Sequence, residues 1–334
     1  MIKNINISGF KSFLENYIEF GNLTLLTGLN SSGKSSIIQA LLMLEKAYYE
    51  KNNILLDNHG NIKELKNPHH KESINFSIYV DDVENTIIID DDDHYKIEGN
   101  SINFPEIIYI SANRFGPTNI LPIFNNSARK NKVGKNGENM IQFIDYYADC
   151  ILDDSLNHPN SEGNTLLFNL RAWLKIISPN VKFDYHLDHK SDSSYALFND
   201  HRSTNVGFGL SYSLSVISTL LIGTIIPNSL TIIENPEAHL HPRGQAELAK
   251  LISLCSNVGS QIIIETHSDH IFDSLRVACK EVTNFSEKFK LHWLTLDEYG
   301  NTKINSPQVD NNGKLDEWPV GLFDQFEINT SKLL

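Results

Sequence analysis

A glycine-rich octet near the start of the chain has the residue types and spacing of a phosphate-binding loop. Residues 28–35 read GLNSSGKS, which fits G-x-x-x-x-G-K-[ST]. In such a loop backbone N–H groups and a helix N-terminus face the phosphates, Lys34 reaches the β- and γ-phosphates, and Ser35 offers a hydroxyl to Mg²⁺. The alternative is a glycine turn with a solvated lysine, but an apolar strand before the loop and a helical period after it favour a nucleotide site. The residues expected to bind the nucleotide are Asn30, Ser31, Ser32, Gly33, Lys34, Ser35 and Ser36.

A second candidate is an acid at the end of an apolar strand. Residues 230–242 read LTIIENPEAHLHP. An acid in this position is how a P-loop ATPase holds Mg²⁺ from the neighbouring strand, so we expect Glu234 to join Ser35 as a metal ligand. The alternative for Glu234 is a helix-capping or surface acid. His239 and His241 could be metal ligands, but no third ligand has suitable spacing, which favours loop packing or a subunit contact.

A third candidate follows the next apolar strand, where residues 262–270 read IIIETHSDH. A strand that ends at the same sheet edge as the phosphate-binding loop would place His267 near the γ-phosphate. A zinc pair of His267 and His270 is disfavoured, because no cysteine or further histidine has suitable spacing. A Ser-His-Asp hydrolase site is excluded as well, since adjacent residues point in different directions and there is no nucleophile elbow.

The elements that must position these residues follow an α/β rhythm, with a different pattern in the middle of the chain. Between 50 and 103, strand-like runs alternate with acidic turns. The run Asp90–Asp93 there is either a cation site or, as we favour, a solvated hairpin turn. The C-terminal third alternates strand and helix, which predicts a largely parallel sheet covered by helices. Strands are expected at 2–10, 17–20, 23–27, 74–80, 86–89, 95–97, 107–110, 230–233, 261–264 and, as two edge strands, 291–296 and 302–304, and helices at 35–49, 141–152, 165–177, 243–255 and 269–280.

Composition restricts the class of protein. The chain has 334 residues, of which 40% are apolar, so it can bury a sizeable core, and its net charge of −13 argues against coating DNA with its whole surface. Its three cysteines are widely spaced and fit neither a disulfide framework nor a zinc site. The first ten residues contain no apolar h-region, so we expect no signal peptide and a cytoplasmic protein. The uncharged stretch 203–233 is broken by glycines and a proline, which indicates a buried helix and strand rather than a membrane span.

The motifs and their order resemble ABC-type ATPase heads of the OLD (overcoming lysogenization defect) and RecF/SMC-like group. The resemblance rests on the loop at 28–35, a long insertion, ENPEAHLHP at 234–242 and IETHSDH at 264–270. The ending DEWPVGLFD at 316–324 is similar to that of small bacterial AAA-type ATPases with a short C-terminal domain of unknown function. The resemblance implies an α/β head with a largely parallel P-loop sheet, flanking helices, an antiparallel β portion and a helical insertion. Within this single head it implies four segments: 1–50 with the P-loop, 51–205 as the insertion, 206–290 with the signature, acidic and histidine segments, and 291–334 as edge strands and tail.

In such heads ATP lies between two subunits, and a glycine-rich signature segment caps the partner's nucleotide. Residues 205–211, NVGFGLS, stand in the right place, although they do not match the family's LSGGQ form. The resemblance therefore implies a homodimer in which Gly207, Gly209 and Ser211 face the partner's ATP. The alternative is a glycine-rich helix start packed in the core.

Two departures from the family pattern bear on catalysis. Related heads carry Asp and then Glu, whereas this chain has Glu234 and then Asn235, whose amide cannot accept a proton from water. Either Glu237 serves as the base or hydrolysis is slow. The family also has a Q-loop residue that faces the nucleotide, and its counterpart here could be either Gln142 or Arg114.

Three functions remain open at this stage. The leading one is an ATP-binding, slowly hydrolysing head that controls a separately encoded effector such as a nuclease, in anti-phage defence. The residues after His267 are too few for the Toprim nuclease of OLD proteins, so the effector is expected on another chain. The second is a RecF/SMC-like ATPase that binds DNA, for which the basic surface would be Arg129, Lys130, Lys132 and Lys135, unless these residues form a solvated loop. The third is a nucleotide-gated scaffold without turnover.

Overall fold

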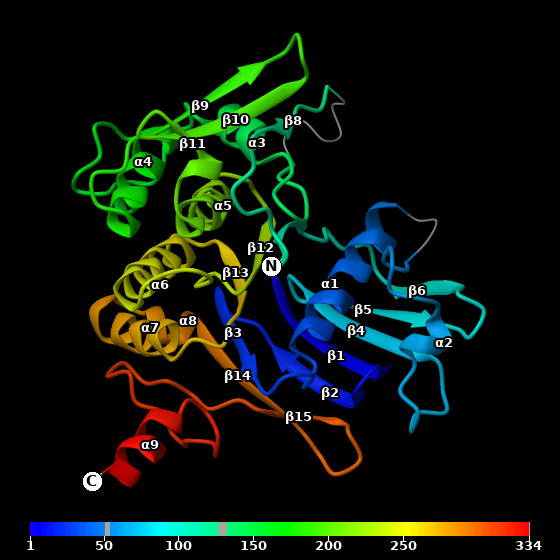
Figure 1. The fold of residues 1–334 in the computed structure, drawn as a ribbon. Coiled ribbons are helices and arrows are strands. Elements are labelled where there is room, and N and C mark those ends of the chain that lie inside the picture. The colour runs from blue at the N-terminus through cyan, green and yellow to red at the C-terminus, as the bar shows by residue number, and fades with distance from the viewer. Residues whose placement is uncertain (51–53, 126–131, 334) are drawn as a thin grey trace. The chain divides into compact units, whose positions relative to one another are not determined.

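Two compact units make up the chain in the computed structural model, which describes residues 1–50, 54–125 and 132–333 (Figure 1). The first unit joins Met1–Ile107 to Ser286–Leu334, and the second is Ile108–Phe285. The α/β fold predicted from the sequence is confirmed.

The elements of the first unit begin with three strands and the helix that follows the glycine-rich loop. They are β1 (Ile2–Phe10), β2 (Phe13–Glu19), β3 (Leu23–Gly28), α1 (Lys34–Tyr49), α2 (Ile62–Leu65), β4 (Ile74–Val80), β5 (Val83–Ile89), β6 (Tyr95–Gly99), β14 (Phe289–Leu296), β15 (Thr302–Asn305) and α9 (Gln325–Leu333). Two further elements, β7 (Glu106–Ile110) and α8 (Phe285–Lys288), lie where the chain passes between the units.

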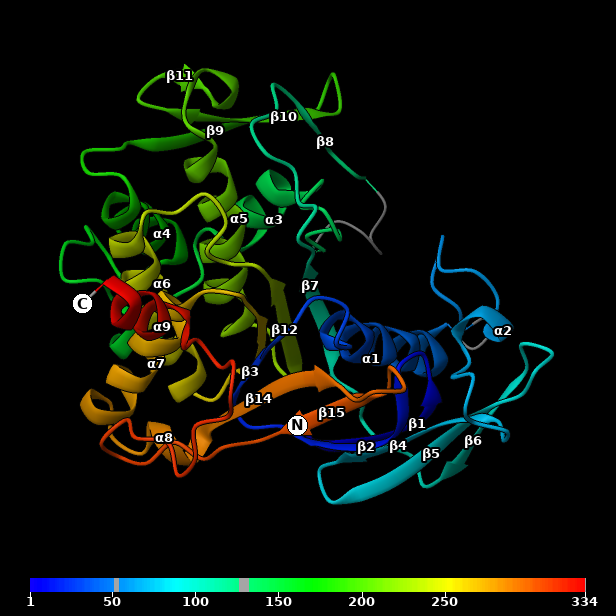
Figure 2. The same ribbon diagram turned by 60° about the horizontal axis from the view of Figure 1, so that its bottom comes forward.

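An antiparallel sheet with the order β2–β1–β4–β5–β6 fills much of the first unit. Burial alternates along β4, so one face of the sheet is apolar and must be covered. Helix α1 runs along this sheet (Figure 2) and is tied to it by side chains: Asn85 donates to the Tyr48 hydroxyl, and Tyr95 donates to the Ala47 carbonyl. The run Asp90–Asp93 lies in the turn of the β5–β6 hairpin, as predicted.

A second sheet in this unit contains β3, the strand that leads into the glycine-rich loop. β14 pairs in parallel with β3 on one side and antiparallel with β15 on the other. The prediction that 291–296 forms an edge strand was therefore wrong, while 302–304 does lie at the edge. The burial of β14, in which Leu291 and Leu294 are 2% and 0% exposed, is what a strand with neighbours on both sides requires.

The second unit packs helices against strands, one of which, β12, leads into residues 234–242, called the acidic segment below. β12 pairs in parallel with β13 and neighbours β7, and α5 contacts both β12 and α6. The elements of this unit are β8 (Leu121–Pro122), α3 (Met140–Tyr147), a 3₁₀ turn (Asp154–Leu156), α4 (Leu166–Ile177), β9 (Phe183–Asp188), β10 (Ser193–Phe198), β11 (His201–Arg202), a second 3₁₀ turn (Ser203–Asn205), α5 (Phe208–Gly223), β12 (Ser229–Glu234), α6 (Pro242–Asn257), β13 (Gln261–Glu265) and α7 (Asp269–Glu281).

The uncharged stretch 203–233 forms α5 and β12, a buried helix followed by a buried strand, as predicted. None of the helices in the described ranges is both long enough and apolar enough to cross a bilayer.

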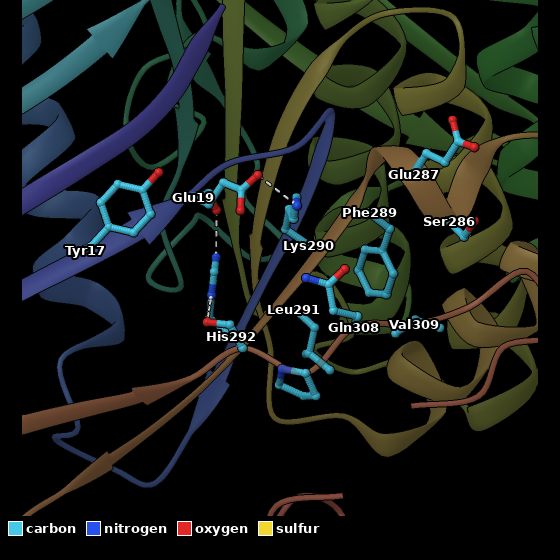
Figure 3. Close-up of a pocket in the computed structure, with 12 residues that line it drawn as sticks. Tyr17, Glu19, Ser286, Glu287, Phe289, Lys290, Leu291, His292, Gln308 and Val309 are labelled. Carbon is cyan, nitrogen blue, oxygen red and sulfur yellow. Dashed lines mark hydrogen bonds and ion pairs between the residues drawn. The ribbon is translucent and has the colours of Figure 1, made fainter. Parts of the chain in front are cut away.

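A hollow of about 190 Å³ lies in the first unit between β2, β14 and the chain at 306–309 (Figure 3). Its floor contains His292, which is 2% exposed. The Nε2–H of this ring donates to the Glu19 carbonyl at 2.7 Å, and the Ser306 hydroxyl donates to Nδ1 at 2.7 Å. Because a carbonyl oxygen can only accept, Nε2 of the ring carries a proton, and burial lowers the pKa of the ring below its ordinary value, which favours the neutral form.

The free energy of unfolding should therefore fall as the pH is lowered from 7.5 to 5.5. His292 stays neutral in the folded chain but takes up a proton in the unfolded chain below the ordinary histidine pKa of about 6.5. Stability is then lost from that pH down to the lowered folded-state pKa, by up to about 1.4 kcal/mol at pH 5.5 for this one residue. Urea unfolding at several pH values should show a shallower decline for His292→Gln than for the natural protein. The exposed-site control His270→Gln should keep the natural decline, and equal slopes in all three proteins would contradict this account.

Candidate functional site

The glycine-rich loop joins a buried strand to a helix, as the motif requires. β3 is buried along its whole length and ends at Gly28, and α1 begins at Lys34. Gly33 stands at the start of α1 with a φ of 107°, a left-handed conformation that favours glycine. A Cβ there would lie 2.8 Å from the Phe13 ring and 2.7 Å from the Thr302 hydroxyl, so a larger residue would also clash. The loop conformation therefore depends on glycine at position 33.

The side chain of Lys34 turns back into the loop. Its ammonium donates to the carbonyl oxygens of Gly28 at 3.0 Å and Leu29 at 2.8 Å, and the residue is 4% exposed. Asn30, Ser31 and Ser35 are exposed, so the Ser35 hydroxyl in the first turn of α1 is accessible to a bound ion.

The remaining expected nucleotide ligands of this loop differ in exposure. Ser36 is half-buried. Ser32 is buried, and its hydroxyl has no hydrogen-bond partner among the described residues. Ser32 is thus placed to act through its backbone, whereas Ser35 presents its side chain.

The acidic residues lie in the second unit, at the carboxyl ends of β12 and β13. Glu234 stands opposite Glu265 in the register of these strands. One carboxylate oxygen of Glu234 accepts from the Tyr109 hydroxyl at 2.9 Å, and the other accepts from the Ala112 N–H at 2.9 Å. Burial and the adjacent Glu234 charge raise the pKa of Tyr109, so the phenol keeps its proton and remains a donor.

Sequence reasoning missed Tyr109 and Ala112. The available signal was the buried strand at 107–110, because residues at the ends of adjacent parallel strands meet at one edge of a sheet. Glu234 keeps lone pairs on both oxygens, so a carboxylate held in this way can still bind a cation.

Arg114 holds the chain that follows Glu234. Its guanidinium donates to the carbonyl oxygens of Glu234 and Asn235, each at 2.8 Å, and the residue is 2% exposed. Burial lowers its pKa to about 10, so it remains charged at neutral pH. These contacts give Arg114 a role inside the second unit, where it fixes the backbone of the acidic segment.

The other Q-loop candidate, Gln142, is also engaged in the structure of this unit. Its side-chain amide donates to the Phe124 carbonyl and accepts from the Phe124 N–H, both at 2.9 Å. Gln142 therefore satisfies both backbone groups of Phe124, which a residue on a paired strand would otherwise do.

Asn235 adopts a left-handed backbone conformation, with a φ of 44°. Asparagine tolerates this region better than most residues, which explains locally why an amide can stand there. Its N–H donates to the Glu265 carbonyl at 2.8 Å, and its side-chain oxygen is buried with no partner among the described residues.

Glu237 and His267 lie side by side in the second unit. Oε1 of Glu237 accepts from the backbone N–H of His267 at 3.2 Å, and Oε2 is buried without a partner in the described part of the chain. Burial raises the pKa of Glu237, although the Thr266 hydroxyl, the His267 N–H and the Arg114 charge oppose the shift. The side chain of His267 is exposed. A carboxylate with a raised pKa and an oxygen that has no partner among the described residues is suited to accept a proton.

Loop packing, one of the two roles predicted for the H-x-H segment, holds for His239, whereas His241 has a capping role that was not predicted. The His239 ring packs against Tyr212 and Phe208, with centroids 4.7 and 5.5 Å away. Nδ1 of His241 accepts from the Arg243 N–H and caps α6. Within the described ranges there is no cluster of three or more His, Cys, Asp or Glu suited to a metal ion.

The glycine-rich segment before α5 is a helix start at the surface of the second unit. Gly207 is exposed, α5 begins at Phe208, and the Phe208 side chain is 57% exposed. Ser211, one turn later, is 8% exposed, and its hydroxyl has no partner among the described residues. The start of α5 is thus exposed and does not match the alternative of a glycine-rich helix start packed in the core.

The basic loop is described only in part. Arg129 and Lys130 lie outside the described residues, whereas Lys132 and Lys135 lie within them. The carbonyl of Lys135 accepts from the Ser111 N–H, which places this end of the loop beside the strand that carries Tyr109.

Comparisons with known proteins bear on the family and the fold. Residues 23–273 match a family described as "AAA domain, putative AbiEii toxin, Type IV TA system", and residues 286–333 match one described as a protein of unknown function (DUF3696). A search of curated proteins gave no match.

Solved structures of SMC heads are similar to the chain over nearly its whole length. An SMC head bound to the C-winged helix domain of ScpA has a TM-score of 0.59 at 15% identity, and covers 92% of this chain and 98% of its own. A head bound to the C-terminal domain of ScpA from Pyrococcus furiosus has 0.58 at 14%, covering 100% and 99%. The Thermotoga maritima head has 0.51 at 14%, covering 91% and 98%. These identities show the fold alone, which is that of SMC/ABC ATPase heads.

Replacing Lys34 tests the phosphate-binding loop directly. Lys34→Ala removes the cation aimed at the phosphates, so ATP affinity should fall by roughly 10-fold or more, the scale of hydrogen bonds to charged groups. Isothermal titration calorimetry with Mg-ATP measures the loss, and the exposed-site control Lys280→Ala should bind as the natural protein does. Unchanged affinity in a folded Lys34→Ala protein would refute the assignment.

Proposed function

Because the chain belongs to the AAA-domain family of putative AbiEii toxins of type IV toxin–antitoxin systems, we propose that it is an ATP-driven head that dimerises on ATP and controls a partner protein. The observation that carries this proposal is that the chain contains both a complete phosphate-binding loop, in its first unit, and an acidic segment with a hydrogen-bonded Glu234, in its second. These are the two kinds of group that bind a nucleoside triphosphate and its metal in P-loop ATPases.

The oxygen donors of the phosphate-binding loop and of the acidic segment suit Mg-ATP. The exposed Ser35 hydroxyl and the Glu234 carboxylate are hard oxygen donors, which Mg²⁺ prefers. Bound Mg²⁺ would neutralise charge on the phosphates, and Lys34 would bind the β- and γ-oxygens. We propose that Asn30, Ser31, Ser32, Gly33 and Ser36 complete the cradle through their backbone and side-chain donors.

Hydrolysis in this proposal is slow and depends on Glu237. Asn235 orients water through its amide oxygen but cannot take a proton, whereas the buried carboxylate of Glu237 can. The exposed His267, beside Glu237, would contact the γ-phosphate. A pKa raised by burial suits Glu237 to this role, because a more basic carboxylate accepts a proton more readily.

The signature role of Gly207, Gly209 and Ser211 is proposed from the exposed start of α5. The exposed helix N-terminus at Gly207 and Phe208 suits a phosphate group supplied by a second copy of the chain, whereas the buried Ser211 would need to become exposed to take part. One composite site would then need the loop of one subunit and the α5 start of the other.

A partner protein is expected in addition to the second copy. Two of the similar SMC heads were solved with ScpA domains bound, and this supports the proposal of a partner protein for this chain. Within the family we place the chain with OLD-like heads on its motif order, and we propose a setting in bacterial defence against phage.

ATP-dependent dimerisation is the most direct test of this function. Light scattering of the natural protein should show a doubling of mass with Mg-ATP or a non-hydrolysable analogue, and Lys34→Ala should remain unchanged in mass. The same measurement on protein isolated from its own cells would reveal a bound partner as additional mass. A strict monomer under both nucleotide conditions, in protein that binds ATP, would contradict the shared site.

The identity of the base is tested by turnover. Glu237→Gln should lower kcat by roughly 100-fold, the lower range for loss of a general base, while the surface control Glu281→Gln has no effect. In the natural protein kcat should fall as the pH drops through the raised pKa of Glu237, because the protonated acid cannot accept a proton. Glu237→Gln should lose this acid limb. If instead Glu237→Gln is unaffected and Asn235→Glu raises kcat, the site has no base, and Glu237 is only structural.

A further inference from the structure

An aromatic cluster joins the start of α5 to the acidic segment, entirely inside the second unit. The Tyr212 ring lies at its centre, one turn into α5 from Phe208. Its centroid lies 4.7 Å from that of His239 and 6.4 Å from that of Phe208, and Phe208 and His239 are 5.5 Å apart. Three rings from two segments are therefore in mutual contact.

The same tyrosine ring also contacts the group that holds Glu234. The guanidinium carbon of Arg114 lies 4.8 Å from the Tyr212 centroid, a cation–π contact. The other side of this guanidinium donates to the carbonyl oxygens of Glu234 and Asn235. One ring thus touches the acidic segment at both ends, through Arg114 at 234–235 and through His239.

Packing around the cluster is tight. A Cβ on Gly209 would lie 2.9 Å from the His239 carbonyl oxygen, so the first turn of α5 already presses against the acidic segment. A Cβ on Gly116 would lie 3.1 Å from both the Phe208 and Tyr212 rings. Packed interiors transmit displacement rather than absorb it, so a shift of the α5 start must be accompanied by a shift of residues 234–240.

The two ends of the cluster differ in exposure. Phe208 is 57% exposed, whereas Arg114 is 2% exposed. The exposed end can meet another protein surface, and the buried end holds the backbone that presents Glu234 and Glu237.

We propose that Tyr212 and Arg114 are positioning residues that couple contacts at the start of α5 to the placement of Glu234 and Glu237. Occupation of the α5 surface by the second copy of the chain shifts Phe208 and Tyr212, and Arg114 and His239 pass this shift to the acidic segment. Turnover is then faster in the dimer than in the monomer. This inference rests on the proposed function, because it assumes that α5 meets the second copy.

Replacing the central ring tests the coupling. Tyr212→Leu removes the cation–π and ring contacts, Tyr212→Phe retains them, and Tyr146→Leu removes a half-exposed ring of α3 as a matched control. Each protein is assayed for ATP affinity, ATP-dependent mass, kcat, and hydrogen exchange of the amides at 234–241. The N–H groups of Asn235, Ala238 and Leu240 donate to backbone carbonyls, so their exchange reports on the order of this segment.

Tyr212→Leu should keep the natural ATP affinity and the natural dimer, but its kcat should fall by roughly 10-fold. Dimer formation should slow exchange at 234–241 in the natural protein and in Tyr212→Phe and Tyr146→Leu, but not in Tyr212→Leu. Protection at 28–36 by ATP should be the same in all four proteins.

Failure of the proposed function and failure of the coupling give different results. A natural protein that neither binds ATP nor dimerises fails the proposed function. A natural protein that does both, with unchanged kcat and exchange in Tyr212→Leu, refutes the coupling. The proposal would also be overturned if Tyr212→Leu lost the dimer, or if Tyr212→Phe showed the same loss of kcat as Tyr212→Leu. If Tyr212→Leu does not fold, Gly116→Ala displaces the same rings more gently and should show the same loss of kcat.

Discussion

The burial of the Arg114 charge is the constraint on which the conformation of the acidic segment depends. A guanidinium removed from water must be compensated by hydrogen bonds and favourable contacts, or burial would be too costly. Here the compensation comes from the Glu234 and Asn235 carbonyls and from the Tyr212 ring. The same contacts that make burial tolerable therefore fix the backbone of the segment that carries both candidate catalytic acids.

The glycine-rich loop is supported in a comparable way by distant parts of its own unit. The Leu29 N–H donates to the Leu294 carbonyl, and the Thr302 hydroxyl donates to the Ser32 carbonyl at 2.8 Å. Both supports come from β14 and β15, within the region matched by the family of unknown function. The C-terminal segment thus belongs to the structural unit of the loop, and its removal would leave the loop without these partners.

The charged groups of the loop and of the acidic segment have different surroundings. The Lys34 ammonium donates to two loop carbonyls, those of Gly28 and Leu29. In the acidic segment, Glu234 receives two donors, and one oxygen of Glu237 is buried with no partner among the described residues. Burial raises the pKa of Glu237, since desolvation disfavours the charged form.

The sequence by itself determined the local elements and the types of chemistry. The hydrophobic alternation of residues 2–10 and 74–80 predicted strands with the observed bounds, because period-two burial is a property of neighbouring residues. The loop motif was equally local: its glycines and Lys34 act within one turn of chain. The interior position of β14 was not predicted, since a strand's neighbours are chosen by long-range pairing and not by its own pattern.

Only the tertiary structure decided which groups support Glu234. Tyr109, Ala112 and Arg114 precede it by more than a hundred residues, and no short-range pattern connects them. The contacts of Arg114 in particular were not predicted, because a guanidinium can donate to many kinds of acceptor and the sequence does not say which one it meets. The choice between them depends on which partners surround the side chain once it is buried, and that is settled by the packing of β7, β12 and α5.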